Sequence, residues 1–435
     1  MIRHAARMDA FDAATVFVAR PAPAFGAVLT RYGISAGGPI AMSGAHFIAS
    51  LIFLHSLSQA EFGLFSFLLI VVPFCLSMSG SLLAPSLMNT LRRTGTLDAA
   101  TISTHLKANL FIGALAAAAV FALLLTSHAN LAAAALMGLY GGVMTLRNFG
   151  RSFAYATKQP HRAFFSDIAY SALLIAGLTA LLFAHQLTIT HAAFVLAAAS
   201  LCALFAFGSG YIARQFRPGS AGSIFAYIPM WQEFARWAVF GVILTEFTAN
   251  AHAYVVTFIS GPKAFAVLAL GSLLMRPASL VLSALPDVER PRMAAKIGRG
   301  DIAGAFRTVK EFRTAAVAMW AATILLAGVL LIWFPEIILK RGYDSTQAME
   351  VLAFWIVIFG VRTLRTPESV FLQAAGEFRA LARVSMWSCL VSLSVTLALL
   401  LLAGPIVSLA GIIAGDLVIT ANIFSLTRQW KRAHA

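Results

Sequence analysis

The feature that most constrains the fold of this chain is a succession of apolar runs separated by short gaps. A run of roughly 20 apolar residues is long enough to cross the hydrocarbon core of a bilayer as an α-helix. Of the 435 residues, 60% are hydrophobic and 11% are charged, whereas about a quarter of a soluble chain is charged. The sequence therefore predicts an all-α, polytopic membrane protein.

Twelve such runs can be distinguished by their hydropathy and by the turns between them. The predicted spans are 35–56, 64–89, 105–126, 130–149, 164–184, 191–213, 234–258, 264–285, 313–334, 348–375, 380–402 and 405–427. The longest internal gap, between the eighth and ninth spans, is strongly basic and is typical of an amphipathic helix on the membrane surface.

The basic residues alternate from one side of these spans to the other. Of the 32 lysines and arginines, only Lys263, Lys340 and Arg341 fall in the gaps after odd-numbered spans. Since basic loops stay in the cytoplasm, we expect both termini to be cytoplasmic in a multi-pass protein of the bacterial inner membrane. The net charge of +15 is explained by this bias, so we predict no nucleic-acid partner.

Two stretches of the second half resemble stretches of the first half. EFGLFSF (61–67) matches AFAVLAL (264–270), with Phe62 opposite Phe265 and Gly63 opposite Ala266, and FAYATKQPHRAF (153–164) matches FLQAAGEFRAL (371–381), with Arg162 opposite Arg379. Both matches are six spans apart, which indicates a parallel repeat of two six-helix lobes around a central cavity. The predicted divisions are a cytoplasmic segment 1–33, lobes 34–213 and 233–428 joined by a cytoplasmic linker 214–232, and a cytoplasmic tail 429–435.

Charged residues inside the predicted spans are the candidate functional residues, because each costs about 2.5–3.5 kcal/mol at the centre of a spanning helix. We expect a substrate-binding cavity formed by Arg276, Arg362, Arg365 and Glu246. Because arginine outnumbers acid at this depth, and guanidinium binds phosphate in a bidentate manner, the cavity suits an anion. An alternative is that Glu246 and Arg276 pair only to hold adjacent helices together.

Two further acids inside the spans, Glu368 and Asp416, are predicted to act in ion coupling or in pairing. Glu368 follows Arg365 at the i,i+3 spacing of a helical ion pair. We expect His46 and His252 to form interhelical hydrogen bonds rather than to carry protons.

Other polar positions support neither catalysis nor metal binding. Arg147, Arg151 and Arg236 lie near cytoplasmic span ends, where arginine side chains commonly reach to the lipid headgroups. We find no catalytic motif, and the spacing of Cys75, Cys202 and Cys389 forms no disulfide framework or metal motif. No catalytic residue, metal or cofactor is therefore predicted.

Several motifs resemble the polysaccharide-export flippases, which belong to the superfamily of multidrug, oligosaccharidyl-lipid and polysaccharide (MOP) exporters. The stretches that carry this resemblance are SLSQAEFGLFSFLLIV, ISGPKAFAVLALGSLLMRPASLVLSALPDVERPRMAAKIGRGD, LQAAGEFRALARVS and LAGIIAGD. The resemblance implies twelve to fourteen helices in two lobes, alternating access, and transport of an undecaprenyl-diphosphate-linked sugar unit. His252, Ala266 and Leu268 depart from the residues common in that family, which leaves cation coupling open.

The resemblance, together with the arginines inside the spans, implies a flippase that moves a lipid-linked oligosaccharide repeat unit for exopolysaccharide, capsule or O-antigen synthesis. The expected partners are this substrate and membrane lipids, with a polysaccharide polymerase and the export machinery as further candidates. The alternatives are a drug or small-solute antiporter of the same superfamily, an intramembrane polysaccharide polymerase or glycosyltransferase, and a scaffold that transports nothing. The short outward gaps disfavour an enzyme.

Overall fold

The computed structural model describes residues 25–94, 97–127, 129–216, 222–334 and 344–434, and every regular element in these ranges is a helix. Most of the predicted cytoplasmic segment 1–33 lies outside these ranges. The long helices of the first half are α1 (Phe25–Ser56), α2 (Gln59–Thr94), α3 (Ala99–Thr126), α4 (Leu131–Ala156), α5 (Pro160–Phe183) and α6 (Ile189–Leu204).

Short elements connect the two halves, and long helices follow. The connecting elements are η1 (Phe205–Phe207), α7 (Ser209–Phe216), η2 (Ile224–Tyr227), α8 (Ile228–Met230) and the π-helical η3 (Trp231–Ala235). The second half contains α9 (Arg236–Leu274), α10 (Arg276–Gly298), α11 (Ile302–Trp333), α13 (Ser345–Ala374), α14 (Phe378–Ala403) and α15 (Leu409–His434).

Short polar residues start several of these helices. The side chains of Asp98, Asn130, Thr188 and Asp344 each accept a hydrogen bond from a backbone N–H in the first turn of the helix that follows. Such N-caps satisfy amide groups that have no partner inside the helix. They therefore fix where each span begins after a short turn.

Ten helices of the described chain are long and apolar enough to cross a membrane, and two features account for the difference from the predicted twelve spans. First, α4 is long enough, but the polar residues of its second half, Arg147, Asn148 and Arg151, lower its hydropathy. Second, α9 contains two arms. Gly261, which precedes Pro262, has φ 85° and ψ 166°, far from helical values.

The two arms of α9 fold back on each other at Gly261. The rings of His252 and Phe265 are 6.3 Å apart, although thirteen residues of straight helix would separate them by about 20 Å. A positive φ is accessible to glycine at little cost. Gly261 therefore provides the turn that was predicted between the seventh and eighth spans.

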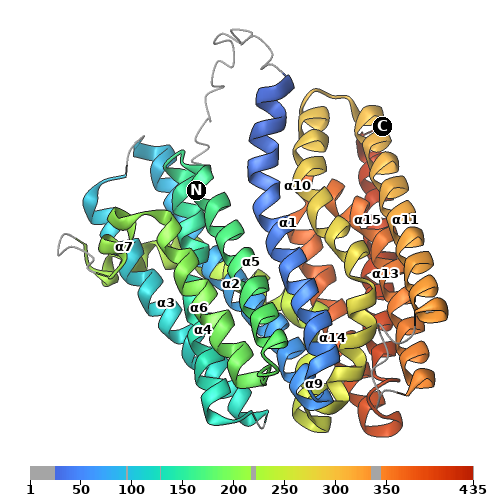
Figure 1. Cartoon of the computed structure of the whole chain (residues 1–435). Coiled ribbons are helices and arrows are strands. Elements are labelled where there is room, and N and C mark those ends of the chain that lie inside the picture. The colour runs from blue at the N-terminus through green and yellow to red at the C-terminus, as the bar shows by residue number, and fades with distance from the viewer. Residues whose placement is uncertain (1–24, 95–96, 128, 217–221, 335–343, 435) are drawn as a thin grey trace, which may run out of the picture.

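The helices form two lobes side by side, with α1–α6 in one and α9–α15 in the other (Figure 1). The described chain begins with α1 and ends with α15 at the same end of the bundle (Figure 1), which we call the termini side. The ends of the described chain lie on one side because the helices between them cross an even number of times. The structure confirms the all-α, two-lobe architecture.

The lobes share a core at one end only. One hydrophobic cluster runs through α1, α2 and α9 on the side opposite the termini, and includes Phe53, Phe67 and Val256. Towards the termini side each lobe has its own cluster, around Phe207 in the first and around Phe371 in the second. The lobes are therefore joined at the far end and packed separately on the termini side.

The junction between the lobes brings equivalent positions of the repeat into contact. A Cβ placed on Gly63 of α2 would overlap the carbonyl oxygen of Pro262 and would lie 3.3 Å from the Cβ of Ala266 in α9. Gly63 and Ala266 are the two residues that the sequence repeat aligns. Equivalent residues of two related units contact each other only where they lie close to the two-fold axis between the units. The axis that relates the two lobes therefore passes near Gly63 and Ala266.

Candidate functional site

A cavity of about 350 Å³ lies within the second lobe, where α9, α10, α13, α14 and α15 meet. Arg362 and Arg365 of α13 line it together with Asp416 of α15. Arg362 Nε lies 2.8 Å from Asp416 Oδ2, and Arg365 Nη1 lies 3.1 Å from Asp416 Oδ1. Both arginines thus converge on one carboxylate, and we call these three residues the C-lobe fork.

The helix geometry explains why the C-lobe fork forms. Positions i and i+3 lie on one face of a helix, so Arg362 and Arg365 both project from α13 towards α15. A Cβ on Gly415 would meet the backbone oxygen of Ser388 and the side chain of Ser392, so α15 packs tightly against α14 there. This packing holds Asp416 almost completely buried, whereas both arginines remain about one-sixth exposed.

A larger cavity of about 1320 Å³ adjoins the first and shares Thr245, Ser369, Gln373, Ser385 and Ile419 with it. Besides the fork, the charged residues that line the two cavities are Glu246, Arg290, Arg379 and Arg383. The lining therefore carries five arginines against two carboxylates, a net of three positive charges. An anion is the ligand that this arrangement favours.

Glu246 lies in the wall of the larger cavity, on the first arm of α9. The hydroxyl of Tyr254 donates a hydrogen bond to Glu246 Oε1 at 2.9 Å. No ion pair between Glu246 and Arg276 is present among the described residues, so the alternative interpretation of these two charges as a helix-holding pair is wrong.

Arg276 is placed apart from the other predicted cavity residues. Its guanidinium lies within electrostatic range of His46 in α1, so it faces the first lobe. It makes no side-chain hydrogen bond or ion pair with the part of the chain that the structure describes, and it is absent from the described lining of both cavities. The structure therefore brings Arg362, Arg365 and Glu246 to adjoining cavities, whereas Arg276 lies nearer to His46 of the first lobe.

Glu368 and Asp416 both act as partners of arginine. Asp416 belongs to the C-lobe fork, whereas Glu368 forms an ion pair with Arg313 of α11. The predicted i,i+3 pair of Arg365 with Glu368 is wrong, because the guanidinium of Arg365 is bonded to α15 instead. Glu368 Oε2 is buried and has no hydrogen-bond partner among the described residues.

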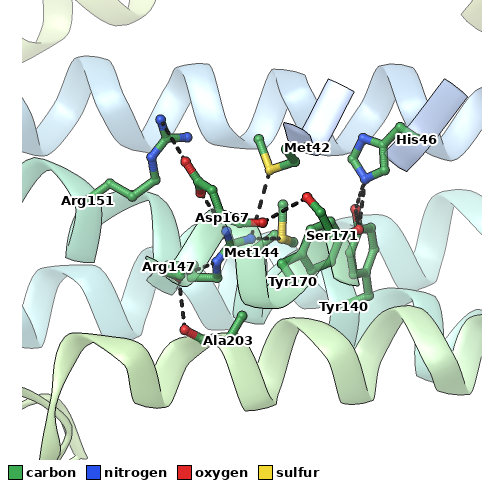
Figure 2. Close-up of polar contacts among 11 residues, drawn as sticks. Met42, His46, Tyr140, Met144, Arg147, Arg151, Asp167, Tyr170, Ser171 and Ala203 are labelled. Carbon is green, nitrogen blue, oxygen red and sulfur yellow. Dashed lines mark hydrogen bonds and ion pairs between the residues drawn. The ribbon is translucent and has the colours of Figure 1, made fainter. Parts of the chain in front are cut away.

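A second fork, which was not predicted, lies in the first lobe (Figure 2). Arg147 Nη2 lies 2.6 Å from Asp167 Oδ1, and Arg151 Nη2 lies 3.4 Å from Asp167 Oδ2. Arg147 Nε also donates to the hydroxyl of Ser166 at 2.8 Å. We call Arg147, Arg151 and Asp167 the N-lobe fork.

Burial distinguishes the N-lobe fork from the C-lobe fork. The side chains of Arg147 and Asp167 are 2% and 1% exposed, so the interpretation of Arg147 as an arginine that reaches to the headgroups is wrong. The second sequence match aligns Phe153 with Phe371, and the same offset aligns Arg147 with Arg365. The repeat therefore positions an arginine at the same level in both lobes, but only in the second lobe does that arginine line a described cavity.

The two histidines inside the spans differ in their surroundings. His46 Nε2 lies 2.8 Å from the hydroxyl of Tyr170 and 3.3 Å from that of Tyr140 (Figure 2), which confirms the predicted interhelical hydrogen bond. The interhelical hydrogen bond predicted for His252 is wrong, because its ring packs against those of Phe265 and Trp355 and its Nδ1 has no partner among the described residues. Among those residues no cluster of His, Cys, Asp and Glu side chains could hold a metal ion.

Comparison with known proteins identifies the fold. No family model matches the sequence, and no curated protein matches it. Among solved structures, the chain is similar to an inward-facing multidrug resistance MATE family transporter of the MOP superfamily, with a TM-score of 0.68, 13% identity, and coverage of 90% of this chain and 95% of the other. It is also similar to the lipid II flippase MurJ in an inward closed conformation, with a TM-score of 0.67, 13% identity, and coverage of 90% and 87%.

The chain has the fold of the MOP superfamily transporters. An outward-facing MATE family transporter matches with a TM-score of 0.58, at 13% identity and with coverage of 92% and 94%. The MOP fold of this chain therefore superposes better on the inward-facing form than on the outward-facing form.

Proposed function

We propose that the chain is a flippase that moves an undecaprenyl-diphosphate-linked oligosaccharide repeat unit across the bacterial inner membrane by alternating access. The product would serve exopolysaccharide, capsule or O-antigen synthesis. The observation that carries the proposal is the C-lobe fork, where two cavity-lining arginines share a single carboxylate. One positive charge therefore remains without a counter-ion at mid-depth in the lobe.

A lipid-linked diphosphate fits this excess charge. A guanidinium has five N–H donors, of which Asp416 occupies one on Arg362 and one on Arg365. The remaining donors are available to the cavity, and charge-assisted bonds to phosphate oxygens are among the strongest hydrogen bonds in proteins. The name of one structural neighbour, the lipid II flippase MurJ, supports a lipid-linked cargo for this fold.

The direction of transport follows from the proposed orientation. Arg379 and Arg383 lie in the first two turns of α14, at its end on the termini side, and they line the larger cavity. If the positive-inside bias places the termini in the cytoplasm, this cavity receives the headgroup from the cytoplasmic leaflet. Arg276, near His46 of the first lobe, would meet the headgroup when the lobes change their relative position.

The proposal can be tested by reconstituting the full chain in proteoliposomes with a fluorescent undecaprenyl-diphosphate-linked oligosaccharide. Transfer between leaflets is followed by the accessibility of the sugar to a glycosidase that cannot cross the membrane. We expect Arg362→Gln and Arg365→Gln to slow transfer at least about tenfold, since each removes a charged hydrogen-bond donor worth about 1.5–3 kcal/mol.

A matched control is Arg292→Gln, because Arg292 is exposed, pairs with Glu289 and lies outside the two cavities. This variant should transfer the lipid at the wild-type rate. Unchanged transfer in both fork variants, with normal folding, would end the proposal.

A drug or small-solute antiporter is the second candidate, and one observation favours it. Glu246 places a carboxylate on the wall of the larger cavity, which could bind a cation. In a drug-hypersensitive host, an antiporter predicts resistance that Glu246→Gln removes and Arg362→Gln leaves intact. The flippase predicts no resistance from the wild-type protein.

A further inference from the structure

The first lobe contains a cavity of about 720 Å³ that the proposed transport cycle does not use. It lies at the termini side, where the end of α4, the start of α5 and helix α7 meet the start of α3. Its volume is in the range of pockets that hold small molecules, about 300–1,000 Å³. It shares no lining residue with the two cavities beside the C-lobe fork.

The charges that line this cavity are all positive. Lys158, Arg162 and Arg214 contribute three cations, and no acidic residue is among the described lining residues. Arg162 donates to the backbone oxygen of Phe207, which holds it in place. Lys158 and Arg214 are exposed, and their side chains make no hydrogen bond or ion pair with the chain in its described ranges.

The backbone adds positive charge at the same place. Helix α5 begins at Pro160, after Gln159, and has no side-chain N-cap. Pro160 has no amide hydrogen, and the amide of Arg162 donates to the carbonyl oxygen of Gln159, so the start of this 24-residue helix acts on the cavity through its dipole. The positive end of a helix dipole stabilises a nearby anion.

The other walls of the cavity are apolar. Leu97, Ile102, Leu106 and Phe153 line it, so the site has a cationic region beside a hydrocarbon-like surface. Nearby aromatic side chains are exposed, including Phe205 at 62% and Phe216 at 50%. Exposed apolar surface of this kind is typical of a contact with membrane, so the cavity lies beside a surface suited to lipid.

We propose that this cavity binds the phosphate headgroup of an anionic membrane phospholipid, with an acyl chain against its apolar wall. Basic pockets between spanning helices on the cytoplasmic side are suited to such headgroups. The site is separate from the path of the transported lipid. Because η1 and α7 begin the connection between the lobes, a bound lipid would brace that connection against the first lobe.

Native mass spectrometry of the purified full chain in detergent tests the proposal, with added dioleoylphosphatidylglycerol, dioleoylphosphatidylcholine or glycerol 3-phosphate as ligand. Each basic residue near an anionic headgroup changes affinity about fivefold. Lys158→Gln with Arg214→Gln should therefore weaken phosphatidylglycerol binding about 30-fold. Arg162 stays, because it holds the Phe207 carbonyl.

A matched control is Arg428→Gln with Arg432→Gln, which removes two exposed arginines from the termini side of the second lobe. This control should bind phosphatidylglycerol within twofold of the wild type, and both double variants should unfold at the wild-type temperature without lipid. Equal binding of the two phospholipids, or equal loss in both double variants, would overturn the proposal. So would binding of glycerol 3-phosphate as tight as that of phosphatidylglycerol, because the ligand would then be a soluble anion.

Discussion

The N-lobe fork tests how much a buried ion pair contributes to the free energy of unfolding. Its carboxylate, Asp167, contacts one buried arginine, Arg147, and one partly exposed arginine, Arg151. The perturbation is Asp167→Asn, which keeps the size and shape of the side chain and removes its charge. Arg147 and Arg151 are then left without the carboxylate that both contact. The change leaves the second lobe and its cavities untouched.

The magnitude follows from burial. Removing one partner of a fully buried pair costs about 3–5 kcal/mol, because the other charge stays buried without compensation. Arg147 meets this condition, since its side chain is 2% exposed and its other contacts are neutral ones to Ser166, Met144 and the ring of Tyr170. We therefore expect Asp167→Asn to lower the free energy of unfolding by about 3–5 kcal/mol.

Two matched variants isolate the cause. Arg151 is 21% exposed and lies 3.4 Å from Asp167, so Arg151→Gln should cost below about 1 kcal/mol. The double variant Arg147→Met with Asp167→Leu removes both buried charges, and buried pairs replaced by apolar residues are often neutral. The double variant should therefore be more stable than Asp167→Asn alone.

The assay is equilibrium unfolding of the purified chain in mixed micelles with increasing sodium dodecyl sulfate, followed by tryptophan fluorescence. The reasoning is refuted if Asp167→Asn unfolds within about 1 kcal/mol of the wild type, or if the double variant is the least stable of the set.

Three further predictions concern single contacts. Gly63→Val introduces a side chain where Pro262 leaves no space, so it should loosen the junction of the lobes, seen as faster proteolysis and a lower unfolding temperature than for the neighbouring Leu64→Val. Trp355→Phe removes the hydrogen bond that Trp355 Nε1 donates to the carbonyl of Leu268 at 2.8 Å and should cost about 0.5–1.5 kcal/mol, measured by the same detergent titration. The hydroxyl and N–H of Thr101 lower the pKa of the Asp98 carboxyl below its usual value. The ionised cap therefore stabilises α3 fully at any pH above the usual pKa of aspartate, and this stability is lost as the pH falls through the lowered pKa. A pH titration of unfolding should show this loss in the wild type and not in Asp98→Asn.

The architecture could be predicted from hydropathy because a bilayer permits few alternatives. Backbone groups in hydrocarbon must bond internally, so each apolar run becomes a helix, and the alternation of basic residues fixes an even number of crossings. The turn after the seventh span could be predicted because Gly261 and Pro262 interrupt an apolar run. The repeat was visible in Gly63 and Ala266, which lie against each other.

The partners of the charged residues could not be predicted, because they depend on how each helix is rotated about its axis. Glu246 and Arg276 lie fifteen residues on either side of Gly261 and so at similar depth, yet they face different spaces. Arg365 forms an ion pair with Asp416, which is far from it in the sequence but on the adjacent helix α15, and not with its sequence neighbour Glu368.

The N-lobe fork was missed although a signal for it existed. Asp167 is an acidic residue inside the predicted span 164–184, and such a residue requires a cation nearby. Arg147 on the preceding span was the obvious partner, but its position near a span end favoured an exposed side chain. The position of Arg147 along its helix can be predicted from the sequence, whereas the direction of its side chain depends on how the helix is rotated about its axis.

The central claim, that the C-lobe fork keeps excess positive charge for an anionic lipid headgroup, is tested most directly by the affinity of the purified chain for undecaprenyl diphosphate. The measurement compares the wild type with Arg362→Gln and Asp416→Asn. The account predicts about 10- to 150-fold weaker binding for Arg362→Gln, which loses a charged donor, and binding at least as tight as that of the wild type for Asp416→Asn, which frees both arginines. Equal weakening in the two variants would contradict it, because the fork would then serve only to hold α13 against α15.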